Sequence, residues 1–390
     1  MKRIYNVLEI GGYSDFQCIG PNCEDDCCRG WNIVVDTNKY IKYKQIKDKK
    51  IKDKIVNSID TKTKYNTLNR IGTLKLDNNK RCILQDEDKL CFIHKNLGEE
   101  YLCKTCREYP KVINSIDGTL EVSYMLSCPE VVRKILLTKE IKSFNFVEKL
   151  IDSDFIANKI ELSEGYGYKS DLFWDIRSVT IHILQSRKYK LWQRILIAGF
   201  LYESLEKCIN SNDKVGAVKA IEKYKSLVDS DEIMDINILV ENDKKLEVIS
   251  SLYNFIVDCM SISESDMSRL DFDKLDLSKA EINKVESAIN DYEYIFENYL
   301  VNYIFQSLIP LGEESLIEQY YKMVFNYGFI ISLLYGKSSV ESITENIIVD
   351  AIYLLTRSIM HNIERVREIE AEFKRNNMYT LAYITMAVKF

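Results

Sequence analysis

The sequence predicts an α+β protein that is mostly α, in which a small cysteine-rich N-terminal domain with short strands precedes a helical C-terminal domain. Nine of the eleven cysteines fall within the first 128 residues, and only Cys208 and Cys259 lie beyond them. Short β-branched runs and turn residues occupy the same region. Beyond about residue 130, apolar residues recur every three or four positions, which is the period of packed helices. We therefore expect domains at residues 1–130 and 131–390.

The N-terminal cysteines are spaced as ligands rather than as core residues. Four thiols lie in the eleven residues from Cys18 to Cys28, and five more follow by residue 128. Free cysteines that pack as small hydrophobes would be scattered along helices. A thiol-rich set in a chain with only three histidines favours zinc or an iron–sulfur cluster. The spacing Cys-x4-Cys-x3-Cys-Cys fits neither a zinc ribbon nor a ferredoxin, so it predicts a thiolate-bound metal without selecting which one.

Composition and charge indicate in which compartment the protein lies and which kinds of partner it binds. The N-terminus carries Lys2 and Arg3 but no apolar signal region, and no apolar run approaches the roughly 20 residues of a membrane span. We therefore expect a cytoplasmic protein whose thiols stay reduced. Residues 1–130 hold 22 Lys and Arg against 19 Asp and Glu, whereas the remainder holds 31 against 40. The acidic C-terminal region disfavours a nucleic-acid partner, because phosphate binding needs clustered basic side chains.

The first elements of the chain are predicted to be short. Residues 4–12 read as a strand or loop that leads into the cysteines. Their apolar run and glycines look like the start of a Rossmann fold, but cysteines occupy the place where its helix would begin. Residues 31–35 predict a strand by their β-branched content. The lysine-rich residues 38–59 predict a solvated helix face, which we favour over a basic patch for a protein partner.

Two hairpins and a helix are expected to present the later thiols. Residues 71–76 and 80–84 are strand-like around an Asp-Asn-Asn turn, and this hairpin would present Cys82. Residues 112–126 predict a second hairpin around an Asp-Gly turn, which would deliver Cys128.

Between the hairpins, residues 98–108 predict a single helix that Pro110 ends. Cys103 and Cys106 would share one face of it at a spacing of three.

The C-terminal region shows apolar stripes with the period of core-facing helices. Ser278 and Glu281 form a capping box before one of them. Pro310 and Gly312 separate two others. The expected helical segments are 172–183, 191–205, 282–299 and 348–366.

Outside the main thiol group, the remaining ligand types are expected to have structural roles. His182 flanks an apolar stripe and is predicted to be a core or boundary residue, and His361 is predicted to face solvent. Cys208 and Cys259 lie in apolar helical contexts and are predicted to be core residues. His94 follows Cys91 by three residues and remains a candidate ligand or hydrogen-bond donor to one.

The cysteine motifs resemble the flagellin lysine-N-methylase (FliB) family, which opens with a cysteine-rich segment akin to the YkgJ zinc- or iron-chelating domain. The first block is Cys18-Ile-Gly-x-x-Cys23-Glu-Asp-x-Cys27-Cys28-x-Gly-Trp31. Later blocks follow in family order over residues 16–130: Arg81-Cys82-Ile-Leu, Leu90-Cys91-Phe-Ile-His94, Leu97-Gly-Glu-Glu-Tyr-Leu102, Thr105-Cys106-Arg-Glu-Tyr-Pro110 and Ser127-Cys128-Pro129. Residues 131–390 resemble the family only in length and helical character.

The resemblance implies a cytoplasmic enzyme that moves methyl groups from S-adenosylmethionine to surface lysines of flagellin and carries a [4Fe–4S] cluster. Cys103 falls where relatives are expected to have serine, and no proline follows Cys82 as it does in related domains. The cysteines that the resemblance marks as metal ligands are Cys18, Cys23, Cys27, Cys28, Cys82, Cys91, Cys106 and Cys128.

Eight thiols exceed the four that one cubane needs, so one centre with spare thiols and two centres both stay open. Neither the S-adenosylmethionine pocket nor a catalytic base is identified, although Trp31 and residues 107–109 lie beside the expected ligands. An alternative without catalysis also stays open, namely a zinc or iron–sulfur module on a helical adaptor.

Overall fold

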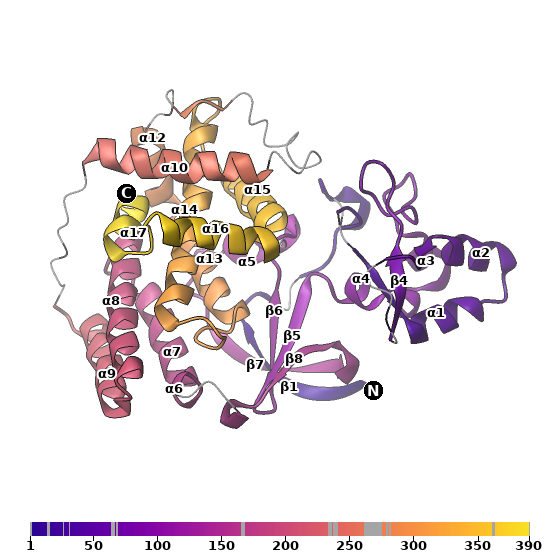
Figure 1. The fold of residues 1–390 in the computed structure, drawn as a ribbon, viewed down its shortest axis with the longest axis horizontal. Coiled ribbons are helices and arrows are strands. Elements are labelled where there is room, and N and C mark those ends of the chain that lie inside the picture. The colour runs from indigo at the N-terminus through magenta and orange to yellow at the C-terminus, as the bar shows by residue number, and fades with distance from the viewer. Residues whose placement is uncertain are drawn as a thin grey trace.

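The computed structural model shows three parts in sequence across Figure 1. A small lobe, residues 32–109, lies at one end and is called the cysteine lobe. A mixed sheet lies in the middle, and a large helical domain lies at the other end. The structure describes residues 2–13, 16–25, 27–30, 32–63, 67, 69–164, 168–232, 236, 241–260, 275–277, 280, 282–360 and 363–389.

The central sheet has five strands in the order β7-β1-β6-β5-β8. β1 is parallel to β6 and antiparallel to β7, while β5 is antiparallel to β6 and parallel to β8. The first strand of the chain thus lies among strands that follow residue 110, and the cysteine lobe is inserted between β1 and β5. The predicted boundary near residue 130 stays a prediction. The strands are β1 Lys2–Ile10, β5 Lys111–Ile116, β6 Thr119–Tyr124, β7 Phe144–Asp152 and β8 Ile156–Ile160.

The hairpin of β5 and β6 confirms the prediction for residues 112–126. Asp117 and Gly118 have φ angles of 46° and 79°, as a tight turn with two left-handed residues requires. Beyond β6, Cys128 is the N-cap of α5, Pro129–Leu136. The hairpin therefore delivers Cys128 to a helix N-terminus.

The cysteine lobe has its own three-stranded sheet, β2-β4-β3, and its own small core. Predicted strand 31–35 is present in part as β2, and predicted strand 71–76 as β4. The lysine-rich segment forms two helices because Asp48 caps the second. The elements are β2 Val34–Asp36, α1 Thr37–Lys44, α2 Lys49–Asn57, β3 Ile59–Asp60, β4 Arg70–Leu74, α3 Phe92–Leu97 and α4 Lys104–Glu108.

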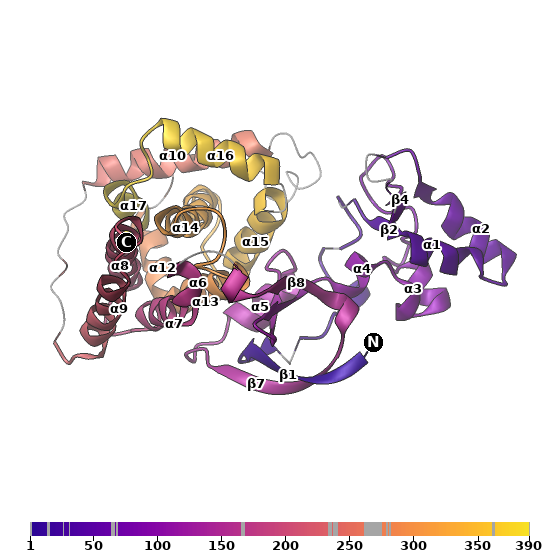
Figure 2. The same ribbon diagram turned by 60° about the horizontal axis from the view of Figure 1, so that its bottom comes forward.

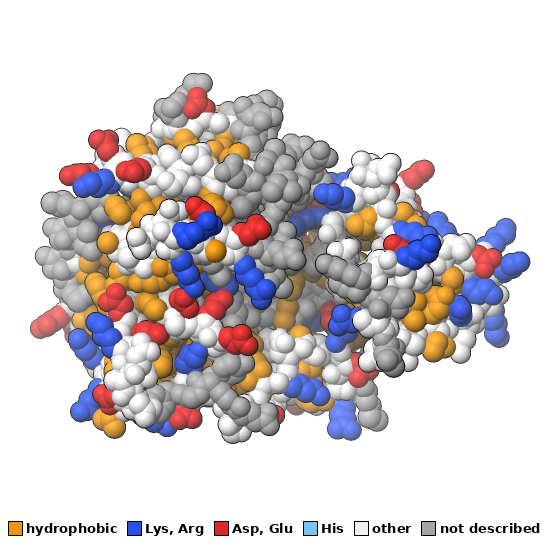
Figure 3. All heavy atoms as spheres, in the orientation of Figure 1, with side chains coloured by type: hydrophobic (Ala, Val, Ile, Leu, Met, Phe, Trp, Pro, Cys, Tyr) orange, Lys and Arg blue, Asp and Glu red, His pale blue; other side chains and the backbone are white. Residues whose placement is uncertain are grey.

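The lysines of α1 and α2 form the solvated face that the sequence predicted. Figure 3 shows Lys and Arg side chains gathered over this end of the molecule. Lys39 donates to the carbonyl of Glu100 at 2.9 Å, and the amine of Lys54 lies 4.0 Å from the centre of the Phe92 ring. Beneath them Tyr43 is fully buried.

Two predictions for the lobe are wrong in detail. The second half of the hairpin at 80–84 is no strand, because the Asp77 carboxylate accepts the backbone N–H of Arg81 at 2.8 Å and closes the turn tightly. Only an isolated bridge joins Leu76 to Cys82.

The single helix expected at 98–108 is broken into a 3₁₀ turn, Glu99–Tyr101, and α4. The Tyr43 hydroxyl donates to the carbonyl of Tyr101 at 2.8 Å, which takes the acceptor that a continuous helix would use. Cys103 is therefore the N-cap of α4 rather than a residue on its face.

The helical domain is built around α14. Figure 2 shows this helix end-on with α8, α10, α13, α15 and α17 around it, and eighteen of its 23 residues are buried. A capping box of Ser315 and Glu318 starts α14. The helices are α6 Tyr168–Asp171, α7 Phe173–Leu184, α8 Leu191–Asn210, α9 Lys214–Asp229, α10 Asn242–Met260, α12 Ile282–Asp291, α13 Glu293–Gln306, α14 Leu316–Ser338, α15 Glu345–Leu355, α16 Ile363–Arg375 and α17 Leu381–Val388.

The predicted helical stripes are confirmed, with two interruptions. Segments 172–183 and 191–205 lie in α7 and α8, and Pro310 falls between α13 and α14. Segment 282–299 is divided at Tyr292, and segment 348–366 contains a π-helical turn, Thr356–Met360. Several predicted features lie outside the described residues: the capping box at 278–281, Trp31, His361 and the side chain of Cys259.

No helix in the described ranges has both the length and the apolar run that a membrane crossing requires.

Candidate metal centre

Six thiols form a first group, which lies at and beside the core of the cysteine lobe. The backbone N–H of Cys82 donates to the carbonyl of Cys28 at 2.7 Å, so the loop after β4 meets the end of the Cys18–Cys28 segment. Cys91 and Cys103 are the N-caps of α3 and α4. The group comprises Cys27, Cys28, Cys82, Cys91, Cys103 and Cys106.

The electrostatics of the first group show that its thiols lie near one another. A hydrogen bond with Cys27 raises the pKa of Cys28 strongly, and burial and the nearby Cys91 and Cys106 add to the increase. Burial raises the pKa of Cys106 well above its ordinary value, and neighbouring thiols raise it further. These thiols would repel one another as thiolates, and a bound cation would offset that repulsion.

A second, smaller group consists of Cys18, Cys23 and Cys128. Burial raises the pKa of Cys128 to about 12, against the lowering effect of backbone N–H groups at the start of α5, and Cys23 and Cys18 raise it further. The backbone N–H of Gly20 donates to the sulfur of Cys18 at 3.4 Å. The structure therefore brings all eight predicted cysteines into two neighbouring groups.

Cys103 joins the first group although the resemblance left it out. It is 1% exposed, and its sulfur lies 3.5 Å from the Tyr43 hydroxyl. Burial raises its pKa to about 11. His94 by contrast lies on the exposed side of α3.

Of the other two expectations for non-ligands, the one for Cys208 agrees with the structure in part. The core or boundary position expected for His182 is wrong, because its side chain is 47% exposed. Cys208 is half-buried against the helical core. His182 pairs at the surface with Asp229 at 2.5 Å.

The donor type of the two groups fits a soft metal or an iron–sulfur cluster. Thiols converge there; Cys82 and Cys103 are buried, whereas Cys18 and Cys27 are exposed. Within the described part of the chain, no three His, Cys, Asp or Glu residues stand in an arrangement that would hold an ion. The thiol groups therefore suit a soft metal or an iron–sulfur cluster by the type of their donor atoms and by the closeness of the thiols.

Tyr109 lies near thiols of both groups. Burial raises its pKa, and among its electrostatic neighbours are Cys128, Cys27 and Arg357. Its hydroxyl lies 3.1 Å from that of Ser127. The sequence marked this position by its closeness to Cys106.

Glu108 lies beside the first group with a carboxylate oxygen 3.7 Å from the amine of Lys104. Burial raises its pKa to about 7, and Lys104 opposes that increase.

Two arginines of the helical part were missed by the sequence. Arg133 of α5 pairs with Glu24, and Arg357 of the π-helical turn pairs with Asp25 at 2.5 Å. Nothing in the spacing of Arg357, which lies 229 residues beyond the last clustered cysteine, points to this contact.

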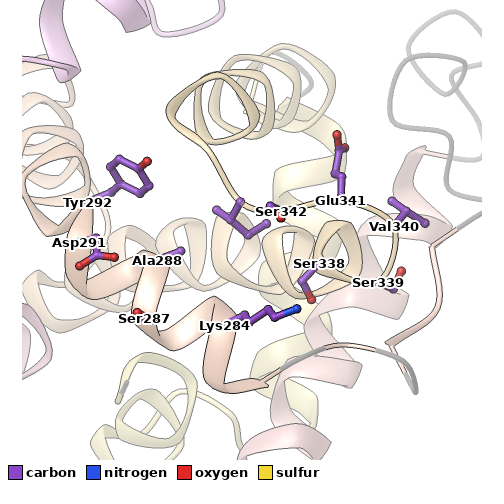
Figure 4. Close-up of a pocket in the computed structure, with 11 residues that line it drawn as sticks. Lys284, Ser287, Ala288, Asp291, Tyr292, Ser338, Ser339, Val340, Glu341 and Ser342 are labelled. Carbon is purple, nitrogen blue, oxygen red and sulfur yellow. The ribbon is translucent and has the colours of Figure 1, made fainter.

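A separate cavity of about 500 Å³ lies in the helical domain between α12 and the segment joining α14 to α15. Figure 4 shows Lys284 of α12 extending toward Ser338 at the end of α14. Its walls are largely polar and include two carboxylates, those of Asp291 and Glu341, and the ring of Tyr292.

The fold and the thiol groups define a helical protein that carries a cysteine-rich N-terminal lobe. Residues 177–387 match the family model of the FliB lysine N-methylase C-terminal domain. Because the match covers more than half of the chain, this chain belongs to the FliB lysine N-methylase family.

Curated relatives support the same family. A segment of 137 residues, 35% of this chain, is 35% identical to the flagellar biosynthetic protein FliU of Salmonella muenchen and covers 79% of that protein. Segments of the same length and identity match the lysine-N-methylases of Salmonella choleraesuis and Salmonella typhimurium, in each case over 33% of the relative. The aligned segment thus spans only a third of those two enzymes. No solved structure matches the chain.

Proposed function

We propose that this chain is a cytoplasmic protein-lysine N-methyltransferase that transfers methyl groups from S-adenosylmethionine to flagellin and depends on an iron–sulfur cluster. The observation that carries the proposal is family membership combined with the convergence of nine thiols in two adjacent groups. The names of the relatives, a lysine-N-methylase and a flagellar biosynthetic protein, favour lysine as the acceptor and flagellin as the protein that bears it.

The thiols of the first group would hold the cluster. Cys27, Cys28, Cys82, Cys91 and Cys106 supply more than the four ligands of one cubane. Cys103 is held by Tyr43 and fits a supporting role. When bound, the cluster would organise a lobe with few core residues, and it could act as a Lewis acid only through an iron that carries no protein thiolate. The second group would hold a further centre or supply spare thiols.

The chain must also prepare the acceptor amine. A lysine amine has an ordinary pKa of about 10.4 and attacks a methyl sulfonium only when neutral. Desolvation or a nearby base must therefore remove its proton. Glu108 and Tyr109 are the candidates beside the thiols, since both are largely shielded from water and lie on the same short segment.

The acidic balance of the C-terminal region suits a lysine-bearing partner. The cavity offers the carboxylates of Asp291 and Glu341 and the ring of Tyr292, which are group types that bind an ammonium group, although the cationic Lys284 also lines it. It is a second place to search for substrate contacts.

The proposal is tested with protein purified without oxygen. Labelled S-adenosylmethionine and the host's flagellin are added, and label on flagellin lysines is measured together with iron and sulfide in the same sample. We expect label on lysines, and we expect it to disappear when Cys27 and Cys28 are both replaced by serine. A metal-loaded sample that transfers no label would contradict the methyltransferase proposal and leave the metal-binding module as the function.

A further inference from the structure

Two acidic residues lie inside the first cysteine motif, and each is bound by an arginine from outside it. The segment reads Cys23-Glu24-Asp25-x-Cys27. Arg133 pairs with Glu24 and also with Glu130 at 3.0 Å on its own helix. Arg357 pairs with Asp25. We call residues 18–29 the cysteine loop.

The contact of Arg357 with the loop is the more buried of the two. Its side chain is 9% exposed and that of Asp25 is 7% exposed, whereas Arg133 and Glu24 are 31% and 35% exposed. The second guanidinium nitrogen of Arg357 donates to the carbonyl of Arg29 at 3.1 Å. One side chain therefore binds the loop on both sides of Cys27 and Cys28.

The backbone around Arg357 is unusual. The residue lies in the π-helical turn Thr356–Met360 between α15 and α16. Such a turn widens the helix, changes the direction of its side chains and frequently marks a functional position. In Figure 1 and Figure 2 the loop lies between the end of α15 and the cysteine lobe. The turn is thus one of the places where the helical part contacts the thiol-bearing loop.

Arg357 also lies near Tyr109, a residue that has a thiol of each group among its neighbours. It is an electrostatic neighbour of Tyr109, whose other neighbours are Cys128 of the second group and Cys27 of the first. Arg133 binds the loop from α5, the helix whose N-cap is Cys128. The two arginines therefore connect the loop to two separate elements of the helical part.

We propose that Arg357 is a positioning residue that fixes the cysteine loop to the helical domain through Asp25, so that Cys23, Cys27 and Cys28 are presented to the metal. The inference rests on the proposed metal centre. It adds that this centre is shaped from the C-terminal region. Arg133 is a second, more exposed anchor with a smaller effect.

The test measures loop exposure and metal retention separately. In reduced, metal-free protein, the rate of iodoacetamide labelling at Cys23 and Cys28, the two partly buried thiols of the loop, is followed by mass spectrometry. In metal-loaded protein, the rate of iron release to a chelator is followed without oxygen. The variants are Arg357→Gln, Arg357→Lys and Asp25→Asn. Arg375→Gln is the matched control, because that arginine is 71% exposed and pairs with Glu372 on α16.

We expect Arg357→Gln to speed iron release by about 10- to 100-fold, the range for groups that orient metal ligands, and to speed labelling of the loop as well. Arg357→Lys keeps the charge but loses the two-pronged contact, so we expect an intermediate effect. Asp25→Asn should act like Arg357→Gln, and the double variant should be no worse than either single variant. The control should behave as wild type.

Two results would separate this inference from the proposed function. Unchanged labelling of the loop in Arg357→Gln, with helical circular dichroism intact, would overturn the inference whether or not the protein binds iron. If Arg357→Gln does not fold, Asp25→Asn carries the same decision from the loop side. A chain that never acquires metal but shows faster labelling in the variants would support the anchor and contradict the metal-dependent function.

Discussion

The cysteine lobe and the helical domain are held together by different means. The described core of the lobe contains eleven buried residues, and two of these are Cys82 and Cys103. Helix α14 alone buries eighteen residues. A small domain with so few core residues needs a further source of stability, such as a metal or a disulfide. From this difference we expect the lobe to depend for its stability on a group bound by its thiols, while the helical domain depends on its apolar core.

Removal of the proposed metal should give the largest difference in stability between the two regions. Binding to thiolates is coupled to folding and is worth about 10–16 kcal/mol for structural zinc in small peptides. We expect chelated protein to be cleaved within residues 32–109 at least tenfold faster than loaded protein. The helical domain should keep its melting temperature. Limited proteolysis with mass spectrometry and circular dichroism checks both expectations. Equal protection of the lobe with and without metal would show that its core suffices.

Breaking a buried ion pair should affect only the helical side. Arg177 of α7 makes two hydrogen bonds, of 2.8 and 2.9 Å, with Glu121 of β6, and the two side chains are 4% and 1% exposed. Arg177→Met leaves a buried carboxylate unpaired, at a cost of about 3–5 kcal/mol. Urea unfolding should show this loss.

The double variant Arg177→Met with Glu121→Leu should recover much of that stability, since it buries no unpaired charge. Lys214→Met, which removes an exposed pair with Asp171, is the control and should change little. Metal content should stay the same in all three variants. A fall in metal content on Arg177→Met would show that metal binding by the lobe depends on the stability of the helical side, contrary to our expectation.

Replacing one helix cap in each region should give the smallest loss of stability, and it compares the same kind of substitution in both regions. Asp48 caps α2 in the lobe, and Asp213 caps α9 in the helical domain, each by accepting a backbone N–H. Replacing either by alanine should cost about 1 kcal/mol locally. We expect Asp48→Ala to speed iron release and Asp213→Ala to lower only the urea midpoint. Identical effects of both variants on both readouts would mean that the two regions unfold as one unit.

Local patterns allowed much of the fold to be predicted. The Asp-Gly turn gave the hairpin of β5 and β6, and apolar stripes gave α7 and α8. The prediction of a single helix at 98–108 was wrong, because the hydroxyl of Tyr43, more than fifty residues away, donates to the carbonyl of Tyr101. Periodicity carries no record of such a distant contact.

The candidate site could be predicted only in part, because local sequence patterns do not report contacts between distant residues. Cysteine spacing marked the thiols, but it could not divide them into two groups or place Cys103 among them. Those facts depend on how the hairpin and α4 fold back on the cysteine loop. The contact of Arg357 could not be predicted from the sequence, because it depends on a π-helical turn and on a partner 332 residues away.

The measurement that tests the central claim most directly is a stepwise removal of iron. A chelator is added in increments to protein purified without oxygen, and iron, methylation of flagellin lysines and helical circular dichroism are recorded at each step. We predict that methylation falls in proportion to iron while the helical signal stays constant. Full methylation in a sample without iron would contradict the account.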